Sequence, residues 1–459
     1  MSYDLIVVGG GPAGYVAAIR AAQLGKKVAC VEKERAGGTC LNWGCIPTKS
    51  LLRNAELYSL LTHHAGEFGL SFQGLAFDWG KVISRSRDVS DKNAAGIEFL
   101  FKKNKVDYIR AEATVDKAGA VVAKSPDGKT ETLAAPRIMI ATGVTSRPMP
   151  GLPFNGKTVI GSREAMVLAP QPKSMIIVGA GAIGIEFAYF FNSFGTKVTV
   201  VEMMPNILPV EDTEVSQTLE KALGKQGIKI LTNTKTTKTE TTDAGVKISV
   251  EGKAAETLEA EVCLVAIGVQ PLLPGGKLKL DLTERGYIKT DENYQTSAPG
   301  IYAAGDIIGP PWLAHVASYE AIQAVNGMFG AGKPKKVTVF PGCTYCQPQV
   351  ASVGLTERAV KEKGIAYKVG KFPYMASGKA RAVGETDGFV KLIIGDPHGE
   401  ILGAHIIGAE ATELIAELGL AITLEATVEE IDATIHAHPT LSEMVHEASE
   451  QAYGHAIHI

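Results

Sequence analysis

Residues 6–34 read IVVGGGPAGYVAAIRAAQLGKKVACVEKE, and residues 176–204 repeat the pattern without a gap as IIVGAGAIGIEFAYFFNSFGTKVTVVEMM. Each copy has a β-branched segment, a G-x-G-x-x-G turn, an apolar helical segment and a second β-branched segment that ends in glutamate. This order is typical of the strand–turn–helix–strand unit that binds a dinucleotide. Two copies predict an α/β protein with two Rossmann-like domains and two nucleotide sites.

The glycines and the glutamate of each copy have separate roles in such a site. The first glycine permits a tight turn, the second lets a pyrophosphate approach the backbone, and the third lets helix and strand pack closely. Free N–H groups at the helix N-terminus attract the phosphates. The glutamate accepts hydrogen bonds from a ribose 2′-hydroxyl and would repel a 2′-phosphate. The candidate residues are Gly9, Gly11, Gly14 and Glu32 in the first copy, and Gly179, Gly181, Gly184 and Glu202 in the second.

A pair of cysteines follows the first copy, where residues 38–49 read GTCLNWGCIPTK. An ideal helix would hold the Cα atoms of Cys40 and Cys45 roughly 9 Å apart, whereas a disulfide needs about 4.4–6.8 Å. Pairing therefore requires a distorted turn, for which Gly44 supplies the backbone freedom. Lys49 lies one helical turn beyond Cys45, where its ammonium would favour a thiolate or polarise a bound ring. Two interpretations stay open here, a redox pair and two buried structural thiols.

Composition excludes several classes of function. The 459 residues carry a formal net charge of −3 without a basic stripe, so nucleic acid is not an expected partner. Six cysteines are too few for a secreted disulfide framework, which predicts a reducing, cytoplasmic setting of bacterial type or a mature organelle-matrix form. The longest apolar stretch, residues 175–191, contains Glu186 and the second glycine motif, which explains it better than a membrane span. Because a buried strand is predicted to begin at Tyr3, no signal peptide is expected.

The positions of these motifs predict four segments, because a chain of this length exceeds a single core. The first two are a dinucleotide domain over residues 1–145 and another over residues 146–270. A central segment covers residues 271–339, and a C-terminal α+β domain covers residues 340–459.

Two short turns extend the candidate nucleotide sites. Thr142 and Gly143 end a predicted strand, and the motif Ala-Gly-Asp ends at Asp306. The Asp306 carboxylate either reaches ribityl or phosphate oxygens or caps a helix. His315 follows in a predicted helix and, taken alone, is more typical of a packed histidine than of a ligand. The C-x-x-C pair at Cys343 has no second Cys or His pair nearby, so a turn with accidental spacing is favoured over a zinc site.

The C-terminal segment ends in a candidate acid–base pair within HAHPTLSE, residues 436–443. Thr440 and Glu443 have the spacing of a capping box, which is one interpretation of the glutamate. In the other, Glu443 holds one nitrogen of His438 so that the other nitrogen acts as a base. Beside a redox cysteine pair, the second interpretation is favoured. Glu186 is expected to be buried and paired, with Lys49 as its candidate partner.

With these motifs, the chain resembles the pyridine nucleotide–disulfide oxidoreductases over essentially its whole length, and most closely the members that oxidise dihydrolipoamide with NAD⁺. The resemblance implies FAD at the first repeat, NAD at the second, a central segment that completes the flavin site and a C-terminal dimerisation (interface) domain. Beyond the glycine motifs, the cofactor-binding residues it implies are Lys49, Thr142, Gly143, Asp306, Ala314, His315 and Gly268.

The resemblance also implies residue roles and partners. Cys40 would exchange with the lipoyl sulfurs, and Cys45 would lie next to the flavin. Lys49, paired with Glu186, would lie near the flavin, while His438 and Glu443 of one subunit of a homodimer would serve the cysteines of the other. Implied partners are the lipoyl domains and acyltransferase (E2) or H-protein of 2-oxo acid dehydrogenase or glycine cleavage complexes. The alternative is an NAD(P)H-dependent reductase of another disulfide or of a metal compound.

The chain departs from the family's pattern at three places. Residues 269–273 read VQPLL where the family usually has an arginine followed by Pro-Asn-Thr. Cys346 stands where threonine is common, and Gln349 where glutamate is common. These departures predict altered contacts near the nicotinamide and altered packing around Cys346.

Overall fold

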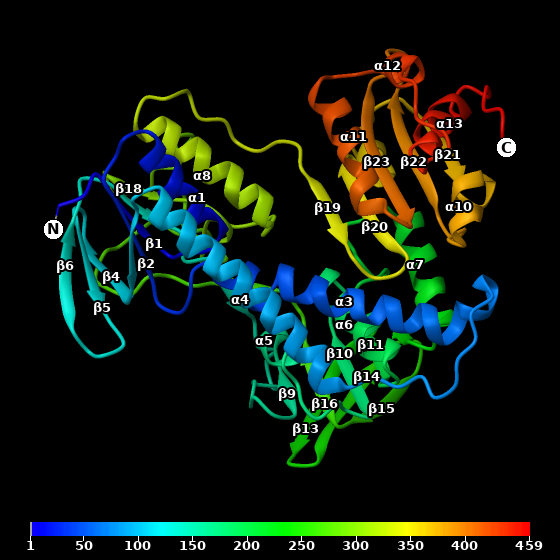
Figure 1. Ribbon diagram of the computed structural model, residues 1–459, viewed down its shortest axis with the longest axis horizontal. Coiled ribbons are helices and arrows are strands. Elements are labelled where there is room, and N and C mark those ends of the chain that lie inside the picture. Colours follow the sequence, from blue (N-terminus) through cyan, green and yellow to red (C-terminus); the bar gives the residue numbers. More distant parts are fainter. Residues whose placement is uncertain (1) are drawn as a thin grey trace. The chain divides into compact units, whose positions relative to one another are not determined.

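The computed structural model describes residues 2–459, which form two compact units (Figure 1). Neither unit is continuous in sequence. The first comprises the chain up to Leu51, Asp78–Arg147 and Gly268–Thr338, and the second comprises Leu52–Phe77, Pro148–Ile267 and Val339–Ile459.

The first unit contains a five-stranded parallel sheet in the order β18-β7-β1-β2-β3. At its centre, β1 (Leu5–Val8) consists of four buried apolar residues, as expected for a strand covered on both faces. β18 (Ile301–Ala303) pairs with β7 (Ile138–Ile140), so the predicted central segment completes this sheet. The other strands are β2 (Val28–Glu32) and β3 (Asp107–Arg110), with helices α1 (Pro12–Gln23), α2 (Gly38–Trp43), α3 (Cys45–Ser59, which continues into the second unit), α4 (Trp79–Lys103), η3 (Asp306–Ile308) and α8 (Ala314–Met328).

Two small antiparallel sheets also belong to this unit. One is a three-stranded meander and the other a two-stranded ribbon. Their strands are β4 (Glu112–Lys117), β5 (Ala120–Lys124) and β6 (Thr130–Ala134), and β8 (Val144–Ser146) with β17 (Val269–Pro271).

The second unit contains another five-stranded parallel sheet, in the order β12-β11-β10-β16-β9, which places the second repeat at its centre. α6 (Ala182–Ser193) is buried from Gly184 to Phe191, which explains its continuous apolar sequence without a membrane. The sheet strands are β9 (Val159–Ile160), β10 (Ser174–Val178), β11 (Lys197–Val201), β12 (Lys229–Leu231) and β16 (Val262–Val265), with β13 (Lys235–Thr242), β14 (Gly245–Glu251) and β15 (Ala255–Ala260) as a separate meander and α5 (Ser162–Ala165) and α7 (Thr213–Lys225) as helices.

The C-terminal part of this unit is an antiparallel sheet in the order β19-β20-β23-β22-β21. Helix α11 packs on β20 and β23, and α13 packs on β21 and β22. The elements are β19 (Pro341–Thr344), β20 (Gln349–Gly354), α9 (Glu357–Glu362), β21 (Tyr367–Pro373), η4 (Tyr374–Ala376), α10 (Gly378–Val383), β22 (Phe389–Gly395), β23 (Ile401–Gly408), α11 (Ala411–Thr423), α12 (Val428–Ala433) and α13 (Glu443–Gln451), while η1 (Leu60–His64) and η2 (Ala65–Phe68) follow α3.

The predicted fold class is confirmed, because two parallel dinucleotide-type sheets are followed by an α+β domain. The exact limits of the four segments stay a prediction. Cys30 and Cys263 are buried in strands β2 and β16, as expected of core thiols. Within residues 2–459, no helix is long and apolar enough to cross a membrane, and no three Cys, His, Asp or Glu side chains are grouped so that they could hold a metal ion.

Candidate active site

The two glycine turns have the same local structure in both repeats. Gly9 and Gly179 each have φ +103°, a conformation that favours glycine. A Cβ on Gly14 would lie 1.8 Å from the Gly9 carbonyl oxygen, and a Cβ on Gly184 would lie 2.0 Å from that of Gly179. The first and third glycines of the motif are therefore required by the backbone itself, as the sequence predicts.

The middle glycine of each turn leaves space instead. A Cβ on Gly181 would meet nothing within 4 Å, and one on Gly11 would meet only the Cα of Gly38, at 3.8 Å. Neither α1 nor α6 has a side-chain cap at its N-terminus, so backbone N–H groups there remain available to a phosphate. Both turns therefore fit a pyrophosphate approaching the backbone.

The two predicted glutamates bind the turns that they follow. Glu32 accepts a hydrogen bond from Gly10 N–H at 2.7 Å and another from Glu34 N–H at 2.8 Å. Glu202 accepts equivalent hydrogen bonds from Ala180 N–H at 2.7 Å and Met204 N–H at 2.8 Å. Each carboxylate is thus held at the end of its strand and still has lone pairs for a ribose hydroxyl.

The cysteine segment is bent at the position that the sequence predicts. Cys40 lies in α2, Cys45 begins α3, and Gly44 separates the two helices with φ −147° and ψ −117°. This break brings the thiols within hydrogen-bond reach of each other. Both are half-buried, which supports a reactive pair over two fully buried structural thiols.

The two thiols differ in electrostatic environment. The pKa of Cys40 is raised by its hydrogen bond to Cys45, by burial and by negative charge on Cys45, while the Lys49 ammonium opposes the shift. Burial and the same two sulfurs raise the pKa of the adjacent Tyr15 hydroxyl. Burial and the contact with Cys45 therefore disfavour a Cys40 thiolate, whereas the Lys49 ammonium favours it.

The cysteine segment also touches the first nucleotide turn. Gly38, the first residue of α2, has φ +56°, and a Cβ there would lie 2.5 Å from the Cα of Gly11. The backbone around the reactive thiols is therefore seated directly on the turn predicted to hold a pyrophosphate.

Several residues predicted to lie around this turn have environments that would suit a bound ligand. The Thr142 hydroxyl is buried without a hydrogen-bond partner among the described residues, and Gly143 has φ +70°. Burial raises the pKa of Asp306 to about 6. Asp306 begins η3 with Gly305 as its N-cap, so the alternative interpretation of this aspartate as a helix cap is wrong.

The N-terminus of α8 also lacks a side-chain cap. Ala314 and His315 are its first two residues, and the N-cap Leu313 contributes no side-chain hydrogen bond. His315 is exposed, so the expectation of a packed histidine is wrong. Gly268, with φ +111°, accepts a hydrogen bond from Arg147 N–H at 3.0 Å through its carbonyl, and its role at the nicotinamide stays a prediction.

His438 and Glu443 form the predicted pair. His438 Nδ1 lies 2.9 Å from Glu443 Oε1, while the other carboxylate oxygen accepts Thr440 N–H at 2.8 Å. The N-cap of α13 is Ser442 rather than Thr440 and makes no side-chain cap hydrogen bond, so the capping-box interpretation is wrong, and Glu443 is the partner of the histidine. Burial raises the pKa of Glu443, but hydrogen bonds from Thr440 and His438 outweigh it and hold the pKa below its usual value.

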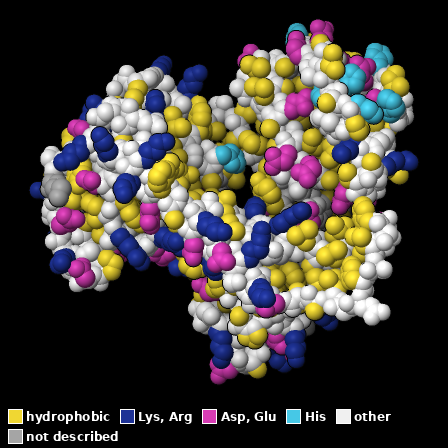
Figure 2. Space-filling model, viewed as in Figure 1, with side chains coloured by type: hydrophobic (Ala, Val, Ile, Leu, Met, Phe, Trp, Pro, Cys, Tyr) yellow, Lys and Arg dark blue, Asp and Glu magenta, His cyan; other side chains and the backbone are white. Residues whose placement is uncertain are grey.

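Pairing with a carboxylate does not by itself distinguish His438. Histidine side chains gather over α12 and α13 (Figure 2), and five histidines between residues 436 and 458 each face an acidic residue. His438 has the most exposed side chain of these, at 81%. Its Nε2 is therefore accessible to a partner surface.

Sequence reasoning missed the residues that hold α2 in place. Arg87 donates to the Asn42 carbonyl at 2.7 Å, and its guanidinium lies over the Trp43 ring. The Asn42 side-chain amide donates to the carbonyls of Ala36 and Gly38. No local pattern signals this anchor, because Arg87 is 45 residues away from Asn42.

Glu186 is buried, as expected, and its Oε1 accepts Tyr345 N–H at 3.0 Å. This contact was not anticipated, and the pairing with Lys49 stays a prediction. Gln349 accepts hydrogen bonds from both the N–H and the hydroxyl of Thr412 at the start of α11. Cys346 is buried, with its thiol 3.4 Å from the Pro348 carbonyl.

Comparisons with known proteins agree with this geometry. Residues 3–321 match the family described as pyridine nucleotide-disulphide oxidoreductase, and residues 340–449 match the dimerisation domain of that family. The chain is 46% identical over 457 residues to a dihydrolipoyl dehydrogenase of Chlorobaculum tepidum, which covers 98% of this chain and 97% of that protein. It is 45% identical over 470 residues to one of Bacillus subtilis, covering 99% of each.

Solved structures show the same fold. The crystal structure of LpdA from Mycobacterium tuberculosis has a TM-score of 0.89 at 26% identity, covering 97% of this chain and 99% of that one. The flavoprotein disulfide reductase RclA from Escherichia coli, in its copper complex, has a TM-score of 0.87 at 25% identity, covering 98% and 99%.

Proposed function

Because the chain belongs to the pyridine nucleotide–disulphide oxidoreductase family, we propose that it oxidises the dihydrolipoyl group with FAD and NAD⁺. The overall reaction is dihydrolipoamide + NAD⁺ → lipoamide + NADH + H⁺. The observation that carries this proposal is the thiol pair of Cys40 and Cys45, bent at Gly44 and seated on the first nucleotide turn.

The protein's own residues account for the thiol chemistry. In the oxidised enzyme, Cys40 and Cys45 form a disulfide, and the two lipoyl thiols reduce it by thiol–disulfide exchange. The lipoyl group leaves as a disulfide, and both cysteines are left reduced. Cys40 is the exchanging sulfur: one lipoyl thiol gives its proton to a base and attacks Cys40, and Cys45 leaves as a thiolate. The second lipoyl sulfur then displaces Cys40 as the lipoyl disulfide closes. When bound, FAD supplies the two-electron acceptor between the thiols and NAD⁺.

The base is His438, oriented by Glu443. Its Nδ1 is occupied by the carboxylate, so Nε2 is the nitrogen that takes and returns the proton. We place this histidine opposite the cysteines of a second copy in a homodimer, which the C-terminal dimerisation domain supports. The lipoyl group arrives on a separate protein, a lipoyl domain of an acyltransferase (E2) or an H-protein, and the high exposure of His438 is consistent with a large substrate.

The nucleotide at the second turn is NAD rather than NADP. Glu202 would repel a 2′-phosphate, and the residues that follow are Met203 and Met204, both exposed and uncharged. No basic side chain stands directly after the strand to bind that phosphate.

The reaction is tested by comparing substrates with the purified holoenzyme. We expect rapid reduction of lipoamide with NADH and NADH formation from dihydrolipoamide with NAD⁺, and little turnover with NADPH. Glutathione disulfide and Cu²⁺ serve as comparison acceptors, since a reductase of another disulfide or of a metal compound would favour one of them. Faster turnover with either acceptor than with lipoamide would reject the proposal.

Substitution of single glycines separates nucleotide binding from folding in the second repeat. Gly181→Ala adds a Cβ to space that no protein atom occupies, so we expect an unchanged Tm but an NADH Kd raised about tenfold or more, because the methyl blocks the pyrophosphate. Fluorescence titration with NADH measures this change.

Gly184→Ala is the contrasting variant. Its Cβ would lie 2.0 Å from the Gly179 carbonyl oxygen, so we expect destabilisation of about 1–3 kcal/mol together with weaker binding. Thermal unfolding compares the two variants. Equal Tm values for both, or unchanged NADH affinity in Gly181→Ala, would contradict this division of roles.

A further inference from the structure

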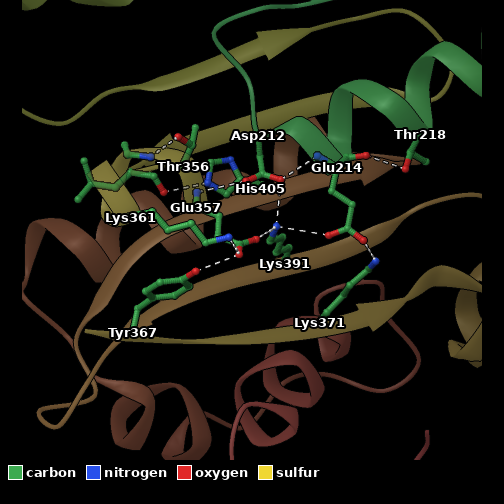
Figure 3. A network of polar contacts seen from close by, with 12 residues as sticks. Asp212, Glu214, Thr218, Thr356, Glu357, Lys361, Tyr367, Lys371, Lys391 and His405 are labelled. Atoms are coloured by element: carbon green, nitrogen blue, oxygen red, sulfur yellow. Dashed lines mark hydrogen bonds and ion pairs between the residues drawn. The ribbon is translucent and has the colours of Figure 1, made fainter. Parts of the chain in front are cut away.

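Within the second unit, a buried ammonium group joins helix α7, which belongs to the second nucleotide repeat, to the C-terminal antiparallel sheet. Lys391, on β22, has a side chain only 2% exposed and pairs with Asp212 Oδ1 at 3.0 Å, Glu357 Oε2 at 2.7 Å and Glu214 Oε2 at 3.3 Å (Figure 3). Asp212 and Glu214 belong to the start of α7, whereas Glu357 begins α9. We call Lys391 and these three carboxylates the Lys391 network.

Two outer lysines balance the charge of the network. Lys371 pairs with the remaining oxygen of Glu214, and Lys361 pairs with Glu357 Oε1 at 2.7 Å. Three ammonium groups therefore face three carboxylates. The neighbouring His405 adds no charge, because burial lowers its pKa. Removing only Lys391 would leave the buried Asp212 carboxylate without its cation, whereas the partly exposed Glu214 and Glu357 would keep their outer lysines. Loss of a buried partner is far more disruptive than loss of an exposed ion pair.

Asp212 links this network to the start of α7. Its Oδ1 accepts Glu214 N–H at 3.1 Å as the helix N-cap, and its Oδ2 accepts Glu357 N–H at 3.2 Å. The aspartate therefore binds three groups at once, two backbone donors and the Lys391 ammonium. The first turn of α7 cannot shift without breaking these contacts.

The segment between Glu202 and Asp212 carries this constraint to the nucleotide turn. At its middle, Leu208 donates its N–H to the Ala180 carbonyl at 2.8 Å, and the Leu208 carbonyl accepts Glu211 N–H at 2.9 Å. Ala180 in turn donates to Glu202 Oε2 at 2.7 Å. Ala180 lies between the first two glycines of the motif. The peptide link between Asp212 and Glu211, followed by these hydrogen bonds, therefore connects the network to the turn.

We propose that Lys391 is a positioning residue for the nicotinamide nucleotide, acting through Asp212 and the 203–212 segment on the turn at Gly179–Gly184. The inference rests on the proposed use of NAD at this turn. Lys391 touches neither nucleotide nor substrate; it holds α7 on the C-terminal sheet and thereby fixes the position of Ala180 and Glu202. The thiol half of the reaction, which uses residues of the first unit and His438, does not depend on it.

The test compares Lys391→Met with Lys361→Met in the holoenzyme. Both variants replace a lysine bound to Glu357 with methionine, but Lys361 is exposed and lies outside the Lys391 network. For Lys391→Met we expect both the NADH Kd and the KM for NAD⁺ to rise about tenfold. Fluorescence titration measures the Kd. An effect of this size is typical of substitutions that act on a ligand site without contacting the ligand. The KM for dihydrolipoamide and its rate of flavin bleaching should remain unchanged. Lys361→Met should match the wild type.

Two further variants test the role of Asp212 as the link between Lys391 and the nucleotide turn. Asp212→Asn, which retains an amide oxygen for capping but loses the charge, should raise the NADH Kd as Lys391→Met does, and the double variant should show less than the sum of the two effects. If the Lys391→Met variant does not fold, the NADH Kd of Asp212→Asn tests the positioning role in its place. An unchanged NADH Kd in the folded variant, or equal slowing of flavin bleaching by dihydrolipoamide, would overturn the positioning role.

The same experiment distinguishes failure of the proposed function. If dihydrolipoamide does not bleach the flavin of the wild type, the proposed reaction is wrong. The comparison of NADH affinity between Lys391→Met and Lys361→Met still decides the role of Lys391.

Discussion

Cys45→Ser is expected to lower dihydrolipoamide-dependent NADH formation by at least about 10³-fold, because no disulfide can form once one member of the pair is gone. The flavin should remain bound, since the contacts predicted to hold it come from the Gly9–Gly14 turn, Glu32 and the Thr142 region rather than from this thiol. Steady-state assay measures the loss, and the ratio of visible to ultraviolet absorbance measures flavin content.

Two controls make this result specific. Cys343→Ser removes a half-buried thiol outside the pair and should retain full activity. Oxidation of NADH by an artificial quinone should continue in Cys45→Ser, because that reaction uses the nucleotide side alone. Substantial NADH formation from dihydrolipoamide in Cys45→Ser would refute the thiol mechanism.

His438→Gln is expected to lower kcat/KM for dihydrolipoamide by about 10²–10⁴-fold, the usual contribution of a general base. The reason is that a lipoyl thiol must lose its proton before it attacks the Cys40–Cys45 disulfide. Without a base, this thiol stays protonated through the neutral range.

The matched control for this substitution is His455→Gln. His455 is similarly exposed and faces Glu450, yet it has no place in the proposed mechanism, so the activity of His455→Gln should match that of the wild type. Glu443→Gln should have a smaller effect than His438→Gln, because it disturbs the orientation of the imidazole but leaves the base in place. Equal losses in His438→Gln and His455→Gln would argue against a specific base.

Mixed dimers test whether the base crosses between subunits. Cys45→Ser and His438→Gln homodimers are both expected to be inactive, yet a heterodimer combines an intact cysteine pair from one subunit with an intact histidine from the other. Random reassociation should then restore about a quarter of the sites, since half of the dimers are mixed and each has one complete site. No recovery would place the cysteines and their histidine in the same subunit.

The local sequence pattern predicted those features whose residues lie within one supersecondary unit. The glycine spacing identified both turns, and the crowding at Gly14 and Gly184 shows the reason, since any side chain would collide with backbone five residues earlier in the chain. The bend at Gly44 followed from the geometric mismatch between helical spacing and disulfide length. The interpretations of Asp306 and His315 taken alone, as a cap and a packed residue, were wrong, because neither burial nor capping at a turn can be read from the residue type.

By itself, the sequence determined that this protein has two nucleotide turns, a bent cysteine pair and a histidine–glutamate pair, because each depends on residues a few positions apart or on one strand–turn–helix unit. Only the tertiary structure decided which distant groups support them: Arg87 holds α2, Tyr345 N–H binds Glu186, and Lys391 joins α7 to the C-terminal sheet. Such contacts join residues 45 to 179 positions apart. They depend on how whole elements pack, and no periodicity in the chain encodes them.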